Sequence, residues 1–203
     1  MNTSSPKPAN AATKLLLAAR EVIRRKGYSA TSVDELCATA GVTKGAFFHH
    51  FASKEALAVA AADNWSSTTS ALFATAAYHA PADPLDRVMA YLDFRAGLLK
   101  GPVEGFTCLV GTMVQEAFAT SPAIRAACDA SISGHAQTLE ADLAAAICQY
   151  GITSVSAQSL ALHTQAVLQG AFILAKARNG PEVALESIVH LKRYFVLLFQ
   201  FHH

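Results

Sequence analysis

The sequence predicts an all-α protein with a small three-helix head at the N-terminus and a larger helical domain behind it. Three observations support this fold class. Apolar residues recur at helical spacing along most of the 203-residue chain. Glycine and proline fall where helices should end or begin, and no run alternates apolar and polar residues well enough to predict a strand. We expect a disordered arm at 1–10, the head at 11–55 and the second domain at 56–203.

The first predicted helix covers residues 12–26 and ends at Gly27. Leucine, valine, isoleucine and alanine form its inner face, and its other face carries Lys14, Arg20, Arg24, Arg25 and Lys26. The last three of these cations have two readings. They either solvate a helix end, where positive charge suits the helix dipole, or attract phosphate.

Residues 31–54, TSVDELCATAGVTKGAFFHHFASK, predict two short helices joined by a tight turn. Ser32 begins the first helix, with Glu35 at the capping-box position, and Gly41 ends it. Thr43 is placed to cap the second helix, which Phe47 anchors inward. This spacing is typical of a helix-turn-helix, at about 32–51, whose second helix enters the major groove of DNA.

Residues 12–60 closely resemble the DNA-binding domain of the tetracycline repressor (TetR) family. The resemblance rests on the G-V-x-K-G turn and the H-F-x-S-K-E-x-L exit, both of which stand intact. It implies a DNA-facing set made of Ser32, Thr43, Lys44, Gly45, Ala46, Phe48, His49, His50 and Lys54. The family usually has a tyrosine where this chain has Phe48, which lacks the hydroxyl that contacts phosphate.

The charge distribution agrees with a nucleic-acid partner. Residues 1–55 hold eight basic and four acidic side chains, net +4, whereas the remainder is net −3. A nearly neutral chain thus has a basic end, which favours salt-dependent attraction to phosphate. We expect Lys44 and Lys54, which flank the recognition helix, to contact DNA because their positions offer them little else to bind.

The second domain is very apolar for a soluble protein, since 52% of the whole chain is hydrophobic and 15% charged. Prolines, acids and bases interrupt its apolar stretches, so no membrane span is predicted. Helices are expected at about 53–78, 84–100, 105–120, 122–150, 154 or 156 to 179, and 182–201. The excess of apolar side chains is to be buried in a core or against another subunit.

The last two predicted helices indicate a dimer interface. The final helix is apolar nearly all round, so it needs cover on two sides. The TetR resemblance likewise implies a homodimer formed by the last two helices of each subunit. The predicted interface residues are Val167, Gly170, Ala171, Leu185, Ile188, Phe195 and Leu198. A monomer with a thick core is the alternative.

The central helices are apolar enough to enclose a pocket for a small-molecule effector, which we expect to be uncharged or aromatic. The candidate lining residues are Trp65, Tyr91, Phe94, Phe106, Cys108, Met113, His163 and Phe172. For His163 the alternative is a hydrogen-bonded core histidine.

Cys108 lies in GFTCLVGTMVQE, which resembles the G-C-L stretch of TetR-family repressors that respond to electrophiles or oxidants. It is either such a sensor, which needs a stabilised and accessible thiolate, or a small buried hydrophobe. The four cysteines form no CxxC pair, and no signal peptide precedes them. We therefore expect reduced thiols and a cytoplasmic location.

No enzyme motif is present: the chain has no H-E-x-x-H, G-x-S-x-G, P-loop or G-x-G-x-x-G. His79, His135, His163 and His190 are isolated, and His202 and His203 end the chain, so we expect no metal and no cofactor. The combined hypothesis is a dimeric repressor, released from palindromic double-stranded operator DNA by an effector. A Cys108 sensor, or an all-α binding protein or enzyme with a vestigial helix-turn-helix, is the alternative.

Overall fold

The computed structural model describes residues 10–200, and this part of the chain is helical throughout, without a β-strand. The head consists of α1 (Ala11–Lys26), α2 (Val33–Ala40) and α3 (Lys44–His50). The remaining elements are α4 (Lys54–Ala74), the 3₁₀ turn η1 (Ala77–His79), α5 (Pro84–Gly97), α6 (Val103–Phe106), α7 (Leu109–Ala117), α8 (Pro122–Gln149), α9 (Ala157–Arg178) and α10 (Glu182–Gln200). The expected arm lies outside the described residues except for Asn10, which caps α1.

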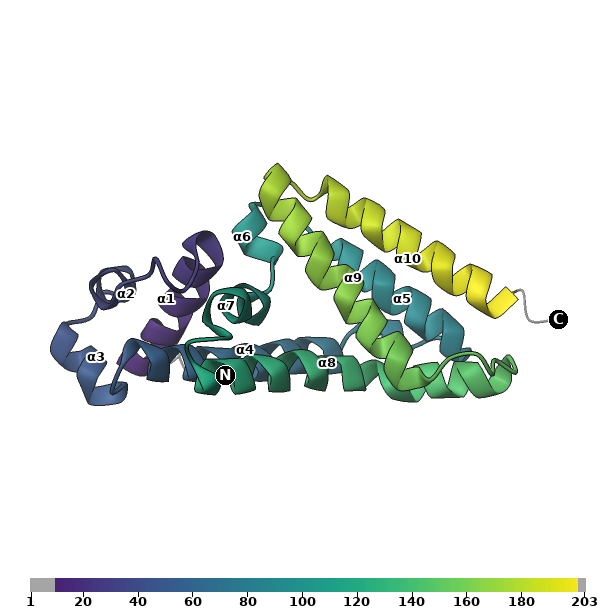
Figure 1. The fold of residues 1–203 in the computed structure, drawn as a ribbon, viewed down its shortest axis with the longest axis horizontal. Coiled ribbons are helices and arrows are strands. Elements are labelled where there is room, and N and C mark those ends of the chain that lie inside the picture. The colour runs from purple at the N-terminus through teal and green to yellow at the C-terminus, as the bar shows by residue number, and fades with distance from the viewer. Residues whose placement is uncertain (1–9, 201–203) are drawn as a thin grey trace, which may run out of the picture.

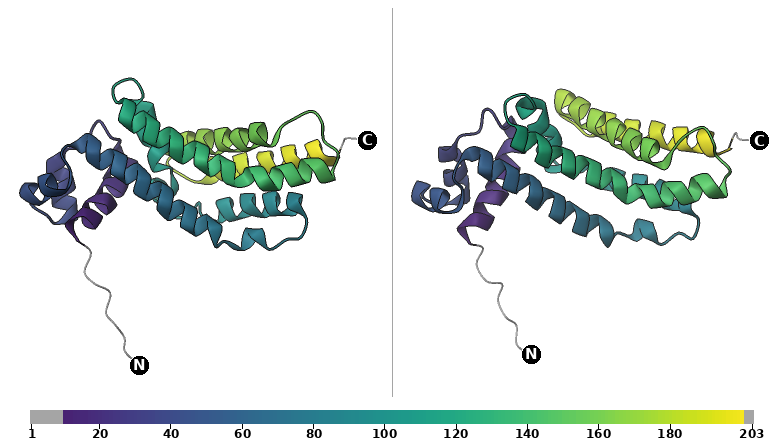
Figure 2. Two further views of the ribbon diagram at one scale, coloured as in Figure 1. Left: turned by 90° about the horizontal axis from the view of Figure 1, so that it is seen from below. Right: turned by 60° about the horizontal axis from the view of Figure 1, so that its bottom comes forward.

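The head lies at one end of an elongated molecule, as Figure 1 shows. Helix α4 runs from the head along the length of the molecule, with α8 packed beside it. Two further views show the same pair of long helices (Figure 2). Helices α5, α9 and α10 pack together at the opposite end, so α4 is the continuous connection between the two ends.

The all-α fold class is confirmed, and most helix boundaries lie within a few residues of those expected. Helix α4 ends at Ala74, earlier than the predicted 78. The chain leaves the helix there and turns through η1, which buries the Tyr78 ring against Phe73 and Tyr91.

The single helix predicted over 105–120 is wrong, because the structure has two helices there, α6 and α7. The break falls at Thr107, whose backbone is extended, and the next residue, Cys108, caps α7. Thr107 is completely buried and its carbonyl oxygen accepts a hydrogen bond from Arg24 of the head. A long-range contact that no local pattern encodes is therefore found at this break.

Two hydrophobic cores hold the molecule together. One is made by the outer helices α5, α8, α9 and α10 with the ends of α4 and α6. The other joins the head to α4, α7 and the start of α8. Phe47 of α3 is fully buried in this second core, to which Leu15, Val22 and Leu36 also belong. Because α7 shares its core with the head, a movement of α7 would change the packing of α1.

Candidate nucleic-acid interface and effector cavity

Helix α3 is fixed at both ends by its own sequence. Thr43 accepts a hydrogen bond from the amide of Ala46 at 3.1 Å, as an N-cap should. Ser32 caps α2 in the same way, and Gly41 ends α2 in the left-handed region at φ 63°. Phe47 anchors α3 in the core, while Phe51 lies just past its end and is only partly buried. All three predicted caps are confirmed.

The opposite face of α3 is open. Lys44, Gly45, Phe48, His49 and His50 are exposed, whereas Ala46 is half-buried. Phe48, 56% exposed, is among the most exposed apolar side chains of the described residues. A side chain added at Gly45 would meet only the Thr43 hydroxyl, at 3.7 Å. This small and open surface is what close approach of a DNA groove requires.

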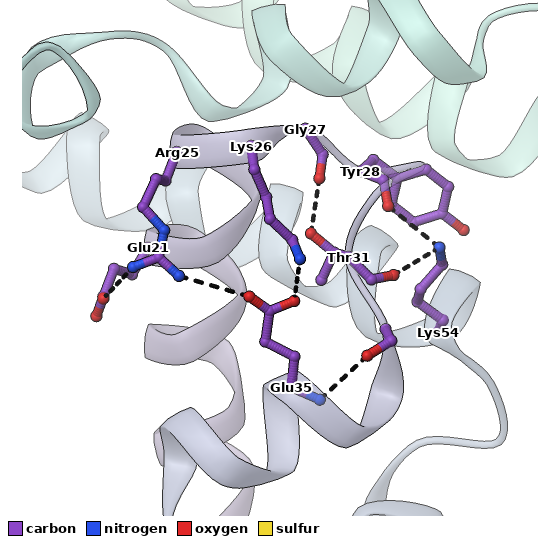
Figure 3. Close-up of polar contacts among 9 residues, drawn as sticks. Glu21, Arg25, Lys26, Gly27, Tyr28, Thr31, Glu35 and Lys54 are labelled. Carbon is purple, nitrogen blue, oxygen red and sulfur yellow. Dashed lines mark hydrogen bonds and ion pairs between the residues drawn. The ribbon is translucent and has the colours of Figure 1, made fainter.

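Lys44 and Lys54 differ in what they already bind. The Lys44 ammonium pairs with Asp34 at 2.6 Å, with both side chains well exposed, so solvent screens the pair. Lys54, in contrast, donates to the carbonyl oxygens of Tyr28 (3.1 Å) and Thr31 (2.9 Å) and lies over the Tyr28 ring (Figure 3). The expectation that Lys54 has no other role is therefore wrong, because it ties α4 to the loop after α1. A DNA contact from it stays a prediction.

Arg25 and Lys26 belong to a contact between α1 and α2. Both bind the Glu35 carboxylate, Lys26 directly and Arg25 at 3.5 Å (Figure 3). The Lys26 ammonium is the main reason that the pKa of Glu35 lies below its usual range. The Glu35 side chain thus reaches α1 rather than completing a capping box with the Ser32 amide. Neither cation simply solvates the helix end.

Arg24 lies on the other side of α1 and faces the rest of the molecule. It is only 9% exposed, its Nε donates to Thr107 O at 2.7 Å, and its guanidinium lies over the Trp65 ring at 4.9 Å. Burial and, to a smaller extent, the nearby charge of Arg20 lower the pKa of Arg24 to about 10. Both readings of Arg24 from the sequence are therefore wrong. The side chain joins α1 to the break between α6 and α7.

Two further bonds connect the head to this region. Glu116 of α7 accepts a hydrogen bond from the Ser29 amide at 2.7 Å, directly beside Gly27. Ser121, the N-cap of α8, donates to the Glu55 carboxylate at the start of α4. Together with Arg24, these bonds attach the head to α7, the preceding loop and the start of α8.

A cavity of about 480 Å³ lies between α1, α4, α5, α6, α7, α8 and α9. Four predicted lining residues contribute to its wall, namely Trp65, Phe106, Cys108 and Phe172. The sequence does not predict which polar residues line the cavity. They are Arg20, Arg24, Asn64, Thr68, Thr69, Arg95, Ser131, His135, Gln165 and Gln169.

The other four predicted lining residues do not reach the cavity wall. Tyr91 is fully buried one layer behind it, where its hydroxyl lies 3.0 Å from His135 Nε2. Phe94 stacks edge-on against Phe73, and Met113 is buried in the head-proximal core. His163 is exposed on α9 against Tyr194, so it is neither a core histidine nor a cavity residue.

Cys108 is partly buried and is the N-cap of α7, where its Sγ accepts from the Gly111 amide at 3.4 Å. Of its nearest cations in sequence, Arg95 and Lys100, only Arg95 lines the same cavity. The charges that couple to it belong to Arg24 and Lys176, from two other helices. The thiol therefore has access to the cavity and lies among cations.

The predicted interface residues divide into two groups. Ala171, Ile188 and Phe195 are at most 3% exposed in the core of their own subunit, so their assignment to a dimer contact is wrong. Val167, Gly170 and Leu198 are half-buried, and Leu185 is 37% exposed. The large apolar side chains that α9 and α10 leave exposed are Leu162, Ile173, Leu174, Leu185, Val189, Tyr194 and Leu197. We call this set the α9–α10 apolar surface.

Residues 10–200 contain no group of three or more His, Cys, Asp or Glu side chains placed to hold a metal ion. In the same part of the chain, no helix combines the length and the apolarity that crossing a membrane demands.

Two families match the chain. Residues 15–61 match "Bacterial regulatory proteins, tetR family", and residues 84–187 match "Transcriptional regulator LmrA/YxaF-like, C-terminal domain". Among curated proteins, the chain is 30% identical to the transcriptional regulator AcuR of Cereibacter sphaeroides over 61% of this chain and 56% of AcuR. It is 29% identical to the HTH-type transcriptional repressor DhaR of Mycobacterium sp. over 52% of this chain and 51% of DhaR. The matches thus span little more than half of these relatives.

Solved structures agree over nearly the whole chain. A TetR transcriptional regulator from Chloroflexus aurantiacus is 26% identical with a TM-score of 0.79, covering 92% of this chain and 94% of the other. The reduced form of NemR from E. coli, 24% identical, has a TM-score of 0.76 over 91% and 96%, a likeness that shows the fold alone. The second family match alone covers half of the sequence, and the head carries the first. The chain therefore belongs to the TetR family of bacterial transcriptional regulators.

Proposed function

We propose that the protein is a dimeric repressor that binds a palindromic operator and leaves it when a small molecule occupies the cavity. One observation carries this proposal. The cavity is walled both by α1, through Arg20 and Arg24, and by α4, from Asn64 to Phe73. Helix α1 packs against α3, and α4 follows α3 directly in the chain, so an occupant touches two helices that adjoin the recognition helix.

The operator side of the proposal is supported by α3. Its exposed face offers one cation, two histidines and a glycine with free space above it. The Lys44–Asp34 pair is exposed, and pairs of this kind are worth about 0–1 kcal/mol, so phosphate can replace Asp34 at low cost. Two such helices in a dimer, about 34–36 Å apart, would read the two half-sites of a palindrome.

Dimerisation is supported by the α9–α10 apolar surface. Exposed leucine, isoleucine and valine side chains on two adjacent helices form a patch that water solvates poorly. A second copy of the same helices would cover it, which is the arrangement typical of the family. The dimer then sets the distance between the two α3 helices.

Release requires an effector that prefers a conformation with lower operator affinity. Within residues 10–200, the segment up to Glu55 makes three hydrogen bonds to later parts of the chain, from Arg24, Ser29 and Glu55, and all three partners lie in or beside α7. An occupant that displaces α7 or the neighbouring part of α4 therefore changes how the head is held. The spacing of the two recognition helices changes with it.

The test begins with operators selected from random double-stranded DNA by the purified protein. Binding is then measured by fluorescence anisotropy at several salt concentrations. Lys44→Ala should lower the affinity and reduce the salt slope by about one if Lys44 meets phosphate, or relax one base position by about 1–3 kcal/mol if it reads guanine. Lys100→Ala removes an exposed lysine outside the head and is the control. Failure to enrich any sequence would refute the operator proposal.

A second candidate is a thiol-responsive repressor, which the position of Cys108 favours. Its Sγ lies at the N-terminus of α7, and the residue lines the cavity in the same wall as Arg24. Oxidation or alkylation there would enlarge the cap of the helix that holds the head. Cys108→Ser decides between the two: a cavity ligand should still release DNA from this variant, whereas a thiol reagent should not.

A further inference from the structure

The polar wall of the cavity is unusual in its charge. It includes three guanidinium groups, from Arg20 and Arg24 on α1 and Arg95 on α5, and no aspartate or glutamate. Arg20 and Arg24 are one helical turn apart, so they share a face of α1. Arg95 comes from a separate helix, α5, about seventy residues further along the chain. The positive charge is thus collected from distant parts of the sequence.

None of the three cations is neutralised. Across residues 10–200, no carboxylate lies within 4 Å of Arg20, Arg24 or Arg95. Arg95 is held between two aromatic faces, 5.4 Å from the Phe73 ring and 5.5 Å from the Phe172 ring. Arg24 uses only its Nε, toward Thr107, and its two terminal nitrogens donate to no acceptor in the described chain.

Arg87 provides the contrast within the same fold. Its Nε donates to Asp142 at 2.7 Å, and its Nη1 donates to two backbone carbonyls, so this half-buried arginine outside the cavity has both an anion and backbone acceptors. A cation that is buried without an anion destabilises the protein unless something neutralises it. Arg24 is in that condition in the cavity wall, and Arg20 and Arg95 lie half-buried beside it, also without a paired carboxylate.

Neighbouring titratable groups respond to the same field. Burial lowers the pKa of His135 to about 4, and the charge of Arg95 contributes, so His135 is neutral at physiological pH. Burial and the charge of Arg24 likewise lower the pKa of Lys176. Glu104 and Glu116 act on Arg24 and Lys176 in the opposite sense, but neither lines the cavity.

We propose that the cavity binds a small organic anion, a carboxylate or sulfonate carried on an apolar or aromatic body, with Arg20, Arg24 and Arg95 as the anion-binding residues. Trp65, Phe106 and Phe172 supply the apolar part of the wall, where the body of the ligand lies. A volume of about 480 Å³ is far larger than an inorganic anion needs and falls within the usual range for small-molecule sites. The role of this anion as the effector rests on the proposed function. The binding of the anion to the cavity does not depend on that function.

The experiment uses matched probes that differ only in charge: 2-naphthoate against 2-naphthamide, and cinnamate against cinnamamide. Isothermal titration calorimetry on the full-length protein gives each affinity. Hydrogen bonds to a charged group are worth about 1.5–3 kcal/mol, so each carboxylate should bind about 10- to 100-fold more tightly than its amide. Equal affinity within a pair, or no binding of either carboxylate at millimolar concentration, would overturn the inference.

Two variants locate the anion. Arg95→Gln and Arg20→Gln should each lower carboxylate affinity about 10-fold and leave amide affinity unchanged. Arg125→Gln removes an exposed arginine of α8 outside the cavity and should change neither. Thermal melting confirms that each variant is folded. A carboxylate preference that survives in both cavity variants would contradict the assignment.

Operator binding separates this inference from the function on which it depends. If the carboxylates bind through the arginines but leave operator affinity unchanged, the anion site stands and the effector role fails. If the uncharged amides release DNA as well as the carboxylates do, the effector role stands and the anion site fails.

Discussion

The head and the cavity use positive charge in opposite ways. In the head, Arg25 and Lys26 bind Glu35, Lys44 binds Asp34, and Lys54 binds two carbonyl oxygens. In the cavity, the guanidinium groups of Arg20, Arg24 and Arg95 face a space without a carboxylate. The net positive charge of the N-terminal segment is therefore a poor guide to its affinity for DNA. Much of its charge holds the head together, and two of its arginines line the cavity.

This difference changes what should be expected of α3. Because few free cations surround it, its contact with DNA depends on shape as well as on charge. Gly45→Leu should therefore have the largest effect, lowering operator affinity by at least about 100-fold, since it blocks base contacts of about 1–3 kcal/mol each in both subunits. Its melting temperature should be unchanged or higher, because glycine costs a helix about 0.5–1 kcal/mol.

The control for that variant is Gly134→Leu, at an exposed position of α8 where a side chain would also meet nothing. It should retain operator binding in the same anisotropy assay. Normal binding by Gly45→Leu would mean that α3 does not approach DNA closely.

The next largest effect is expected from a substitution that disrupts the dimer. Val189 is 46% exposed on α10, and a charge there should separate the subunits because burying it unpaired is strongly unfavourable. Val189→Glu should sediment as a monomer at micromolar concentration and lose operator affinity. Phe118→Glu alters a similarly exposed side chain, 56% exposed at the end of α7, and should remain dimeric. A monomeric wild-type protein would end the argument for a dimer.

The cavity also contains a histidine, His135, that should make the stability of the fold sensitive to acid. The pKa of His135 is about 4 in the folded protein and 6.5 in the unfolded chain, so below pH 6.5 the unfolded chain takes up a proton that the fold does not. Stability should therefore fall as the pH drops from 6.5 to 5, by about 2 kcal/mol from this group. Urea unfolding at both pH values measures it. His135→Gln should remove this part of the loss, and an identical profile would show that His135 is not responsible.

Two adjacent arginines offer the smallest and sharpest comparison. Arg24→Met removes a buried hydrogen bond to Thr107 and should lower the free energy of unfolding by about 1–2 kcal/mol. Arg25→Met removes an exposed pair at 3.5 Å and should change it by less than about 0.5 kcal/mol. Equal effects in urea unfolding would show that Arg24 does not hold the head to the α6–α7 break.

The same two regions also differ in how far the sequence predicts them. The caps Ser32 and Thr43, the turn at Gly41 and the anchor Phe47 act within a few residues, so local spacing was sufficient to place them. The cavity brings together side chains from seven helices. Nothing near Arg95 or His135 in the sequence indicates that they face the same space as Arg24.

The errors follow the same rule. Tyr91, Met113 and Ile188 are apolar or aromatic at helical spacing, which predicts burial but not which cavity or interface a side chain faces. The sequence predicts a DNA contact for Lys54 because its acceptors, Tyr28 and Thr31, lie more than twenty residues away and are not evident from local spacing. One signal for the cavity was available: Arg20 and Arg24 stand one turn apart on α1, and so do Gln165 and Gln169 on α9.

The central claim is that the cavity and α3 are coupled, and thermodynamic linkage tests it most directly. The affinity for 2-naphthoate is measured by calorimetry with and without a selected operator, and the operator affinity with and without 2-naphthoate. Coupling requires that each ligand weaken the other by the same factor, and typical coupling energies correspond to about 5- to 150-fold. We expect equal factors within that range. Tight binding of both ligands with a factor of one in either direction would contradict the coupling of the cavity to α3.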